Sequence, residues 1–283
     1  MRVILVPLSG EHHDRAALTA AYHVAQRFRS HIVGLFMRPD PVDAISVFQG
    51  IPLDMVDQVA RAATTTWNDR ARLARQAFDE ARAAADAAFA DHPTGTDTVS
   101  AHWREVSGAE DLVLAANGRL SDLIVLAGVR SAAGEIKERF ATALFHTVRP
   151  VLLVPEQGME AMPRTVAIAW SGTAEATRAL CGALPLLLNA ERLHVVTAVT
   201  PRTRVESGAA VAEYLAWHGL ICEIHPMYPD DGVGPALLAR ARELETDLLV
   251  MGGYGRSRMR ERIFGGVTQH VLDHHDIAVL IAH

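Results

Sequence analysis

The sequence predicts an α/β protein built from two tandem doubly wound parallel sheets of about five strands each. Short apolar runs alternate with amphipathic segments along the chain, and each run is apolar throughout rather than at every second position. Such runs are typical of parallel strands that helices cover on both faces. The same order of segments occurs twice, and 283 residues suit two domains of ordinary size.

The internal repeat consists of three matched pairs of segments. "RVILVPLSG" from Arg2 matches "TVAIAWSG" from Thr165, and "SDLIVLAG" from Ser121 matches "TDLLVMGG" from Thr246. The third pair is "ERFATALFHTVRPVLLVPE" and "ERIFGGVTQHVLDHHDIAVLIAH". Because all three pairs come in the same order, chance similarity of apolar runs does not explain them.

The linker between the repeats is the polar, Pro- and Gly-containing stretch 155–164. It predicts domains at 1–155 and 164–283. The expected strands of the first half are 3–7, 31–37, 98–106, 122–127 and 150–155, and its expected helices are 14–28, 54–91, 109–117 and 138–147. The helix 54–91 is expected to break once near Thr64–Thr66. Those of the second half are strands 165–170, 192–199, 221–226, 247–252 and 277–282. Pairing of 151–154 with 278–282 would cover an exposed edge in each half.

Composition limits the class of protein. A formal net charge of −6 gives no general attraction to nucleic acid or anionic lipid, so neither is expected as a partner. No segment has the roughly 18 uninterrupted apolar residues of a membrane span, and the N-terminal apolar run is too short for a signal peptide. Cys181 and Cys222 lie in apolar segments outside any CxxC pattern, which predicts buried reduced thiols. These features predict a cytoplasmic protein.

The most informative segment is "LVMGGYGRSRMRERIFGGVTQH", residues 249–270. An apolar strand ends at Gly252, and glycines there let backbone amides approach an anion closely. The pair Gly265-Gly266 opens a helix whose N-terminal amides favour a second anion contact. Arg256 and Arg258 lie between them, so the chemistry suits a polyphosphate. Two tight turns remain the alternative, since neither a Walker A loop nor GxGxxG is present.

The pattern Gly252-x2-Gly255-x9-Gly265, between "DLLVM" and "GVTQHVL", resembles the nucleotide-binding signature of universal stress proteins. "AWSGTAEATRAL" from Ala169 is similar to the first strand-to-helix turn of that family. The resemblance covers both halves and is strongest in the second. It implies the adenine nucleotide alpha-hydrolase-like fold of universal stress proteins, two copies paired about a pseudo-twofold, and a cytoplasmic role in stress response. In one branch of the family it also implies bound ATP, with Mg²⁺ accompanying it.

The resemblance implies nucleotide-binding positions in the second half. They are Trp170, Ser171, Val199, Met251, Gly252, Gly255, Arg256, Arg258, Gly265, Gly266, Val267 and Thr268. Two of them depart from the ATP-binding pattern. Trp170 occupies the place of an Asp, and Gly266 that of a Ser or Thr. In the first half Ala127 replaces Gly252 and the second glycine pair is absent, so that copy is expected to bind no nucleotide.

The sequence shows no catalytic pairing and no metal site. Ser171 is expected to cap the following helix, and His12-His13 and His274-His275 are expected to be exposed loop histidines. The predicted function is a sensor or regulator that binds adenine nucleotide in the second domain and contacts an unidentified protein. The alternative is a nucleotide-free interaction scaffold with vestigial glycine loops. Weak ATP hydrolysis, and a homodimer beyond the internal pseudo-dimer, remain open.

Overall fold

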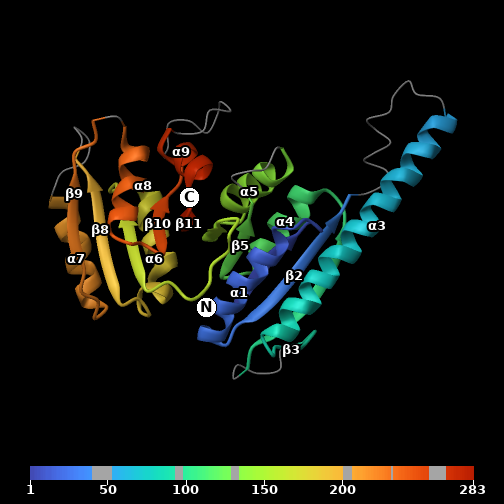
Figure 1. The fold of residues 1–283 in the computed structure, drawn as a ribbon, viewed down its shortest axis with the longest axis horizontal. Coiled ribbons are helices and arrows are strands. Elements are labelled where there is room, and N and C mark those ends of the chain that lie inside the picture. The colour runs from blue at the N-terminus through green and yellow to red at the C-terminus, as the bar shows by residue number, and fades with distance from the viewer. Residues whose placement is uncertain (40–52, 93–97, 129–133, 200–205, 231, 255–265) are drawn as a thin grey trace.

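The computed structural model describes residues 1–39, 53–92, 98–128, 134–199, 206–230, 232–254 and 266–283. Their strands form one 11-stranded sheet in the order β3-β4-β2-β1-β5-β6-β11-β10-β7-β8-β9 (Figure 1). The N-terminal half contributes β1 (Val3–Leu8), β2 (His31–Arg38), β3 (Ala88–Phe89), β4 (Ser100–Ser107), β5 (Leu123–Ala127) and β6 (Val151–Val154). The C-terminal half contributes β7 (Thr165–Ala169), β8 (Arg192–Ala198), β9 (Glu223–Met227), β10 (Leu248–Gly252) and β11 (Ala278–Ala282).

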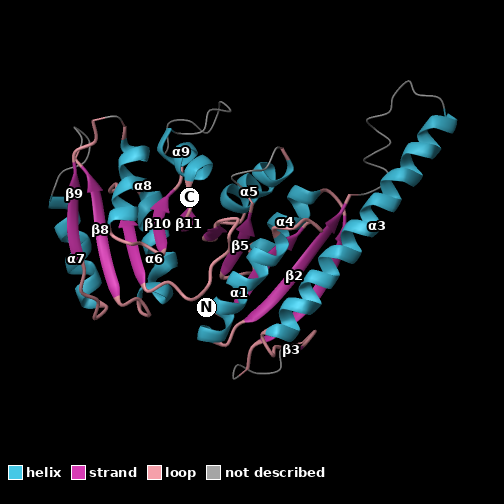
Figure 2. Ribbon diagram, viewed as in Figure 1, coloured by secondary structure: helices cyan, strands magenta, loops and turns pink. Residues whose placement is uncertain are grey.

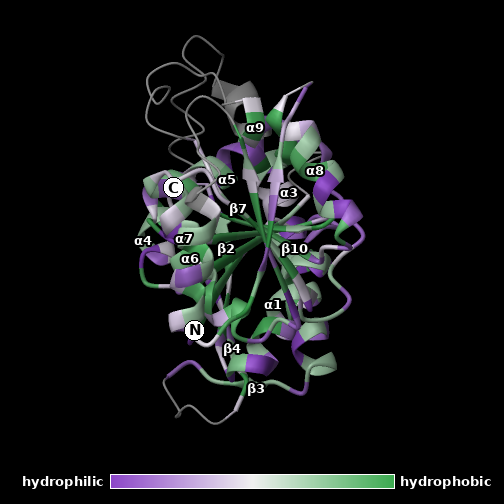
Figure 3. Cartoon of the chain, turned by 90° about the vertical axis from the view of Figure 1, so that its left-hand side faces the viewer, coloured by the Kyte–Doolittle hydropathy of each residue, from purple (hydrophilic) through white to green (hydrophobic). Residues whose placement is uncertain are grey.

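Helices form a layer on each face of the sheet (Figure 2). One face packs against α1 (Asp14–Phe28), α3 (Leu53–Ala84), α6 (Ala174–Leu187) and α7 (Glu206–Trp217). The other packs against α4 (Glu110–Gly118), α5 (Glu135–His146), α8 (Val233–Glu243) and α9 (Gly266–His274). Each layer has its own buried apolar cluster, and both clusters contain residues of both halves. Figure 3 shows the hydrophobic strands in the middle, between the two helical layers.

The two halves meet at the pair β6 and β11. These strands run antiparallel, with Leu280 opposite Leu152, whereas every other neighbouring pair in the described sheet is parallel. The predicted pairing of 151–154 with 278–282 is therefore confirmed. The two expected sheets merge into one, because each has an unpartnered edge strand whose backbone groups the other satisfies.

The long helix of the N-terminal half differs from its prediction at two places. It ends at Ala84 rather than near residue 91, and the chain turns through Asp86 (φ 49°) into the short strand β3. It is also continuous through Thr64–Thr66, where a break was expected. All three threonine hydroxyls donate to carbonyls four residues earlier, so these side chains are accommodated within the helix.

Several burial predictions are wrong. Cys181 is exposed and Cys222 is half-buried, and both are free thiols. His13 and His275 are buried, although both were expected in exposed loops. Among the described helices, none is long and apolar enough to cross a membrane.

Candidate functional site

A cleft of about 590 Å³ opens at the carboxyl ends of the C-terminal strands. Strand β7 is the first of this half, and the chain continues to β8 on one side of it while β10 lies on the other. This reversal is a topological switch point, where open α/β sheets bind their ligands. The lining comprises Ala169, Trp170, Ser171, Gly172, Thr173, Glu175, Val196, Ala198, Met227, Val233, Leu237, Met251, Gly252, Tyr254, Gly266, Val267 and Thr268.

Seven of the residues singled out from the sequence line this cleft together: Trp170, Ser171, Met251, Gly252, Gly266, Val267 and Thr268. Val199 does not line it. Its amide donates to the Met227 carbonyl at 2.9 Å, and the cleft is lined instead by Val196 and Ala198. Val199 comes directly after the last residue of β8, and the alternate residues Val196 and Ala198 of that strand are the ones that face the cleft. Gly255, Arg256, Arg258 and Gly265 lie outside the described residues.

The two described signature glycines differ in their surroundings. A Cβ added to Gly252 would lie 2.5 Å from the Ala176 nitrogen and 2.7 Å from the Glu175 carbonyl carbon. Strand β10 therefore needs glycine there to pack against the first turn of α6. A Cβ added to Gly266, the first residue of α9, would meet no atom of the described residues within 4 Å. Packing therefore explains why position 252 is a glycine, but it does not explain the glycine at position 266.

The backbone amides after Gly252 are used within the protein. The Gly253 amide donates to the Ala282 carbonyl at 2.8 Å, which extends the ladder between β10 and β11. Tyr254 has a left-handed backbone (φ 53°), and its amide donates to the Thr268 hydroxyl over 3.4 Å. This bond joins the turn to α9. An anion in the cleft would thus meet fewer amides than the glycine pattern alone suggests.

A carboxylate that the sequence analysis did not assign to the site also lines the cleft. Glu175, in the first turn of α6, is 5% exposed. Burial acts to raise its pKa, but hydrogen bonds from its own amide and from Thr173, with nearby His283, hold the pKa below its ordinary value. Thr173, not Ser171, caps α6, since its hydroxyl accepts from the Ala176 amide. Glu175 is therefore an ionised group in the cleft at neutral pH.

In the N-terminal half, the corresponding turn lies between β1 and α1, and its donors are bonded to the carboxyl group of Asp14. Asp14 accepts hydrogen bonds from the Ser9 amide at 3.0 Å, the Ser9 hydroxyl at 3.0 Å and the Gly10 amide at 2.7 Å. At the same spacing from Ser171 the C-terminal half has Ala176, which offers no such group. The turn amides of the first copy already donate to a carboxyl group of the protein, which gives a physical reason to expect no nucleotide there.

Tyr254 links the cleft to the junction of the halves. Its ring lies 5.2 Å from that of Phe145 on α5, and Phe145 also contacts His283 edge to face at 4.9 Å. The His283 Nδ1 lies 3.0 Å from the Gly253 carbonyl. The N-terminal half thus packs, through Phe145, against the wall of the cleft that contains Tyr254.

Residues 230–283 match the model of the universal stress protein family. This segment contains β10, α9, β11 and the C-terminal part of the cleft. No curated protein matches the chain by sequence.

Solved structures show that the whole chain has the fold of tandem universal stress proteins. One from Archaeoglobus fulgidus has a TM-score of 0.70 at 15% identity, over 99% of this chain and 97% of that one. A putative universal stress protein from Pseudomonas aeruginosa has a TM-score of 0.54 at 18% identity, over 100% and 93%. A universal stress protein solved in complex with cAMP is 23% identical, has a TM-score of 0.37, and covers 44% of this chain and 98% of its own.

Proposed function

We propose that the C-terminal cleft binds an adenine nucleotide and that the chain acts as a nucleotide-responsive regulator in the stress response. The observation that supports this most is the convergence of the seven residues. They come from three separate segments, 170–171, 251–252 and 266–268, and line one cleft at the switch point. Its volume lies within the range of about 300–1,000 Å³ that is usual for small-molecule sites.

The chemistry of the lining suggests how each part of a nucleotide would be held. The indole of Trp170 would stack on the base, beside the apolar side chains of Val196 and Met251. The N-terminus of α9, at Gly266, would face the phosphates with its amides and dipole. The ionised Glu175 would repel a bare phosphate, so it suits the ribose hydroxyls, to which a carboxylate can act as acceptor.

The remaining parts of the proposal come from the sequence. Arg256 and Arg258 would neutralise phosphate charge, and Mg²⁺ would accompany ATP. A bound nucleotide would cover the cleft face of Trp170 and α9, and so change the surface that a protein partner meets. The domain boundaries at 155 and 164, a cytoplasmic location and a homodimer remain predictions.

Thermal unfolding of the full chain tests the binding step, with and without Mg-ATP, ADP, AMP and cyclic AMP. A ligand at 100 times its Kd stabilises the folded state by about 2.7 kcal/mol, which is a shift of several degrees. Trp170→Ala should remove most of the shift. Trp217→Ala is the matched control, since that indole is 84% exposed and outside the cleft lining. Equal shifts in both variants would contradict the assigned role of Trp170.

A nucleotide-free interaction scaffold is the second candidate. The ionised Glu175 and the internal use of the Gly253 and Tyr254 amides favour it. This candidate predicts the same melting temperature with every nucleotide. In that case, partners should be sought by cross-linking at the cleft rim.

A further inference from the structure

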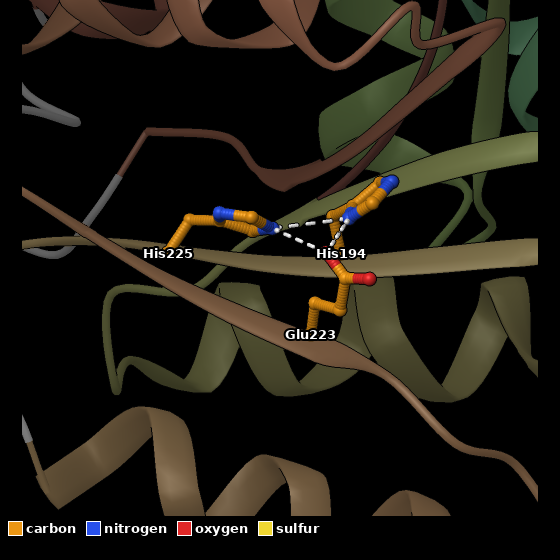
Figure 4. A group of neighbouring side chains, drawn as sticks. All are labelled: His194, Glu223 and His225. Atoms are coloured by element: carbon orange, nitrogen blue, oxygen red, sulfur yellow. Dashed lines mark hydrogen bonds and ion pairs between the residues drawn. The ribbon is translucent and has the colours of Figure 1, made fainter.

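Three metal-ligating side chains meet on the outer strands of the C-terminal half, away from the cleft lining (Figure 4). His194 lies on β8, and Glu223 and His225 lie on the neighbouring strand β9, the last in the sheet. The His194 Nδ1 lies 3.1 Å from the His225 Nε2 and 3.7 Å from the Glu223 Oε2. The His225 Nε2 lies 3.5 Å from the same carboxylate oxygen.

These three separations match one face of a tetrahedral coordination shell. A zinc ion with ligands at about 2.0–2.1 Å and tetrahedral angles holds its ligand atoms about 3.3–3.4 Å apart. We propose that His194, Glu223 and His225 form a binding site for a divalent transition-metal ion of the zinc type. Two imidazoles and one carboxylate are a ligand set that zinc uses, with water as the fourth ligand.

The exposure of the three groups leaves room for that water. The side chain of His194 is 6% exposed, that of His225 is 22% exposed, and that of Glu223 is 74% exposed. An ion would therefore rest on a buried imidazole and reach solvent on the Glu223 side.

A hydrogen bond between the two histidines is the competing explanation of their contact. One ring would then donate and the other accept, with a single proton between Nδ1 and Nε2. An ion would replace that proton and use both lone pairs. The other nitrogen of His194, Nε2, is buried without a hydrogen-bond partner among the described residues. Since loss of such an outer contact costs about 10–100-fold in metal affinity, we expect a site of moderate affinity.

The N-terminal half provides a natural control. In the C-terminal half, His194 lies opposite Glu223, and His225 is two residues further along β9. In the N-terminal half, His31 on β2 lies opposite Ser100 on β4 in the same way, and His102 is two residues further along β4. The His31 Nε2 lies 2.7 Å from the His102 Nδ1, and the His31 Nδ1 lies 2.8 Å from the Ser100 hydroxyl. Both nitrogens of His31 thus have partners, and a hydroxyl takes the place of the carboxylate.

A bound ion would cross-link β9 to β8 through their side chains. His194 and His225 are two residues before Val196 and Met227, which line the cleft from the same two strands. Occupancy should therefore stabilise the outer wall of the cleft. The proposal does not depend on nucleotide binding, because none of the three ligands lines the cleft.

The test is a titration of the chelator-treated full chain with Co²⁺, whose visible absorption reports tetrahedral coordination, followed by displacement with Zn²⁺. We expect one ion per chain, bound with moderate affinity. Glu223→Gln should weaken binding by at least about tenfold, since it removes one of three protein ligands. Its side chain is exposed, so folding should be unaffected. His225→Gln should remove the tetrahedral signal, whereas His102→Gln, the same change in the N-terminal pair, should leave it intact.

Two outcomes would overturn the proposal. Wild-type chain that binds neither ion would show that the cluster is only a hydrogen-bonded pair beside a surface carboxylate. Equal affinity in wild type and Glu223→Gln would place the ion elsewhere, for instance at His270 and His274. Those two rings stack on α9 with centroids 4.2 Å apart.

Discussion

Substitution of Gly252 by alanine separates the two explanations of the glycine turn. If the glycine is needed for packing, the added methyl group destabilises the protein without any ligand. If it is needed only to admit a phosphate, Gly252→Ala leaves the folded state unchanged and lowers nucleotide affinity. The structure favours packing, because the new Cβ would lie 2.5 Å from the backbone nitrogen of Ala176.

The magnitude follows from the atoms that must move. The three nearest atoms belong to the backbone of α6, at 2.5, 2.7 and 3.0 Å, so no flexible side chain can yield. Overpacking of this kind costs about 1–3 kcal/mol. At about 2–4 °C for each kcal/mol, the melting temperature should fall by about 2–12 °C. Gly266→Ala is the matched control. Its Cβ would meet none of the described part of the chain within 4 Å, so the change should stay within about 0.5 kcal/mol.

The assay is thermal and urea unfolding of the ligand-free chain for wild type and both variants. A fall for Gly252→Ala alone supports the packing argument. Gly252→Ala as stable as wild type would refute it, because the strand and α6 would then have room that the structure does not show. Gly266→Ala as damaging as Gly252→Ala would refute it too.

Three further predictions concern residues of the N-terminal half and of the junction between the halves. Asp14→Ala should destabilise the chain by about 1–3 kcal/mol in urea unfolding, because the buried donors of Ser9 and Gly10 lose their acceptor. Leu280→Ala should cost about 2–5 kcal/mol by the same measurement, since this fully buried residue sits where the halves join. Burial, with nearby positive groups, lowers the pKa of His102 from 6.5 to about 4. As the pH falls, this imidazole is therefore protonated in the unfolded state before it is protonated in the folded state. Stability should then fall as the pH drops from 6.5 towards 4, and His102→Gln should reduce that fall in unfolding midpoints measured across this range.

The secondary structure and the twofold repeat of this protein could be inferred from its residues alone. The uniformly apolar runs predicted buried parallel strands, and the ordered repeat predicted two copies of one α/β plan. The exposed edges of 151–154 and 278–282 predicted the pair that joins them. These features depend on local composition and on the rule that a strand edge needs a partner, so they could be inferred before any contact was known. The position of the glycine turn at a strand end, beside the cleft, followed in the same way.

Which side chains meet in the cleft and in the histidine cluster depends on contacts between distant segments. Glu175 enters the cleft because α6 is capped by Thr173 rather than by Ser171, which places Glu175 in the first turn of the helix. Val199 does not line it because it follows the last residue of β8, where Val196 and Ala198 already face the cleft. His194 lies far along the chain from Glu223 and His225, and only the register of β8 with β9 brings the three together. A shift of one residue in that register would send those side chains to opposite faces, and strand register is set by long-range packing rather than by local sequence.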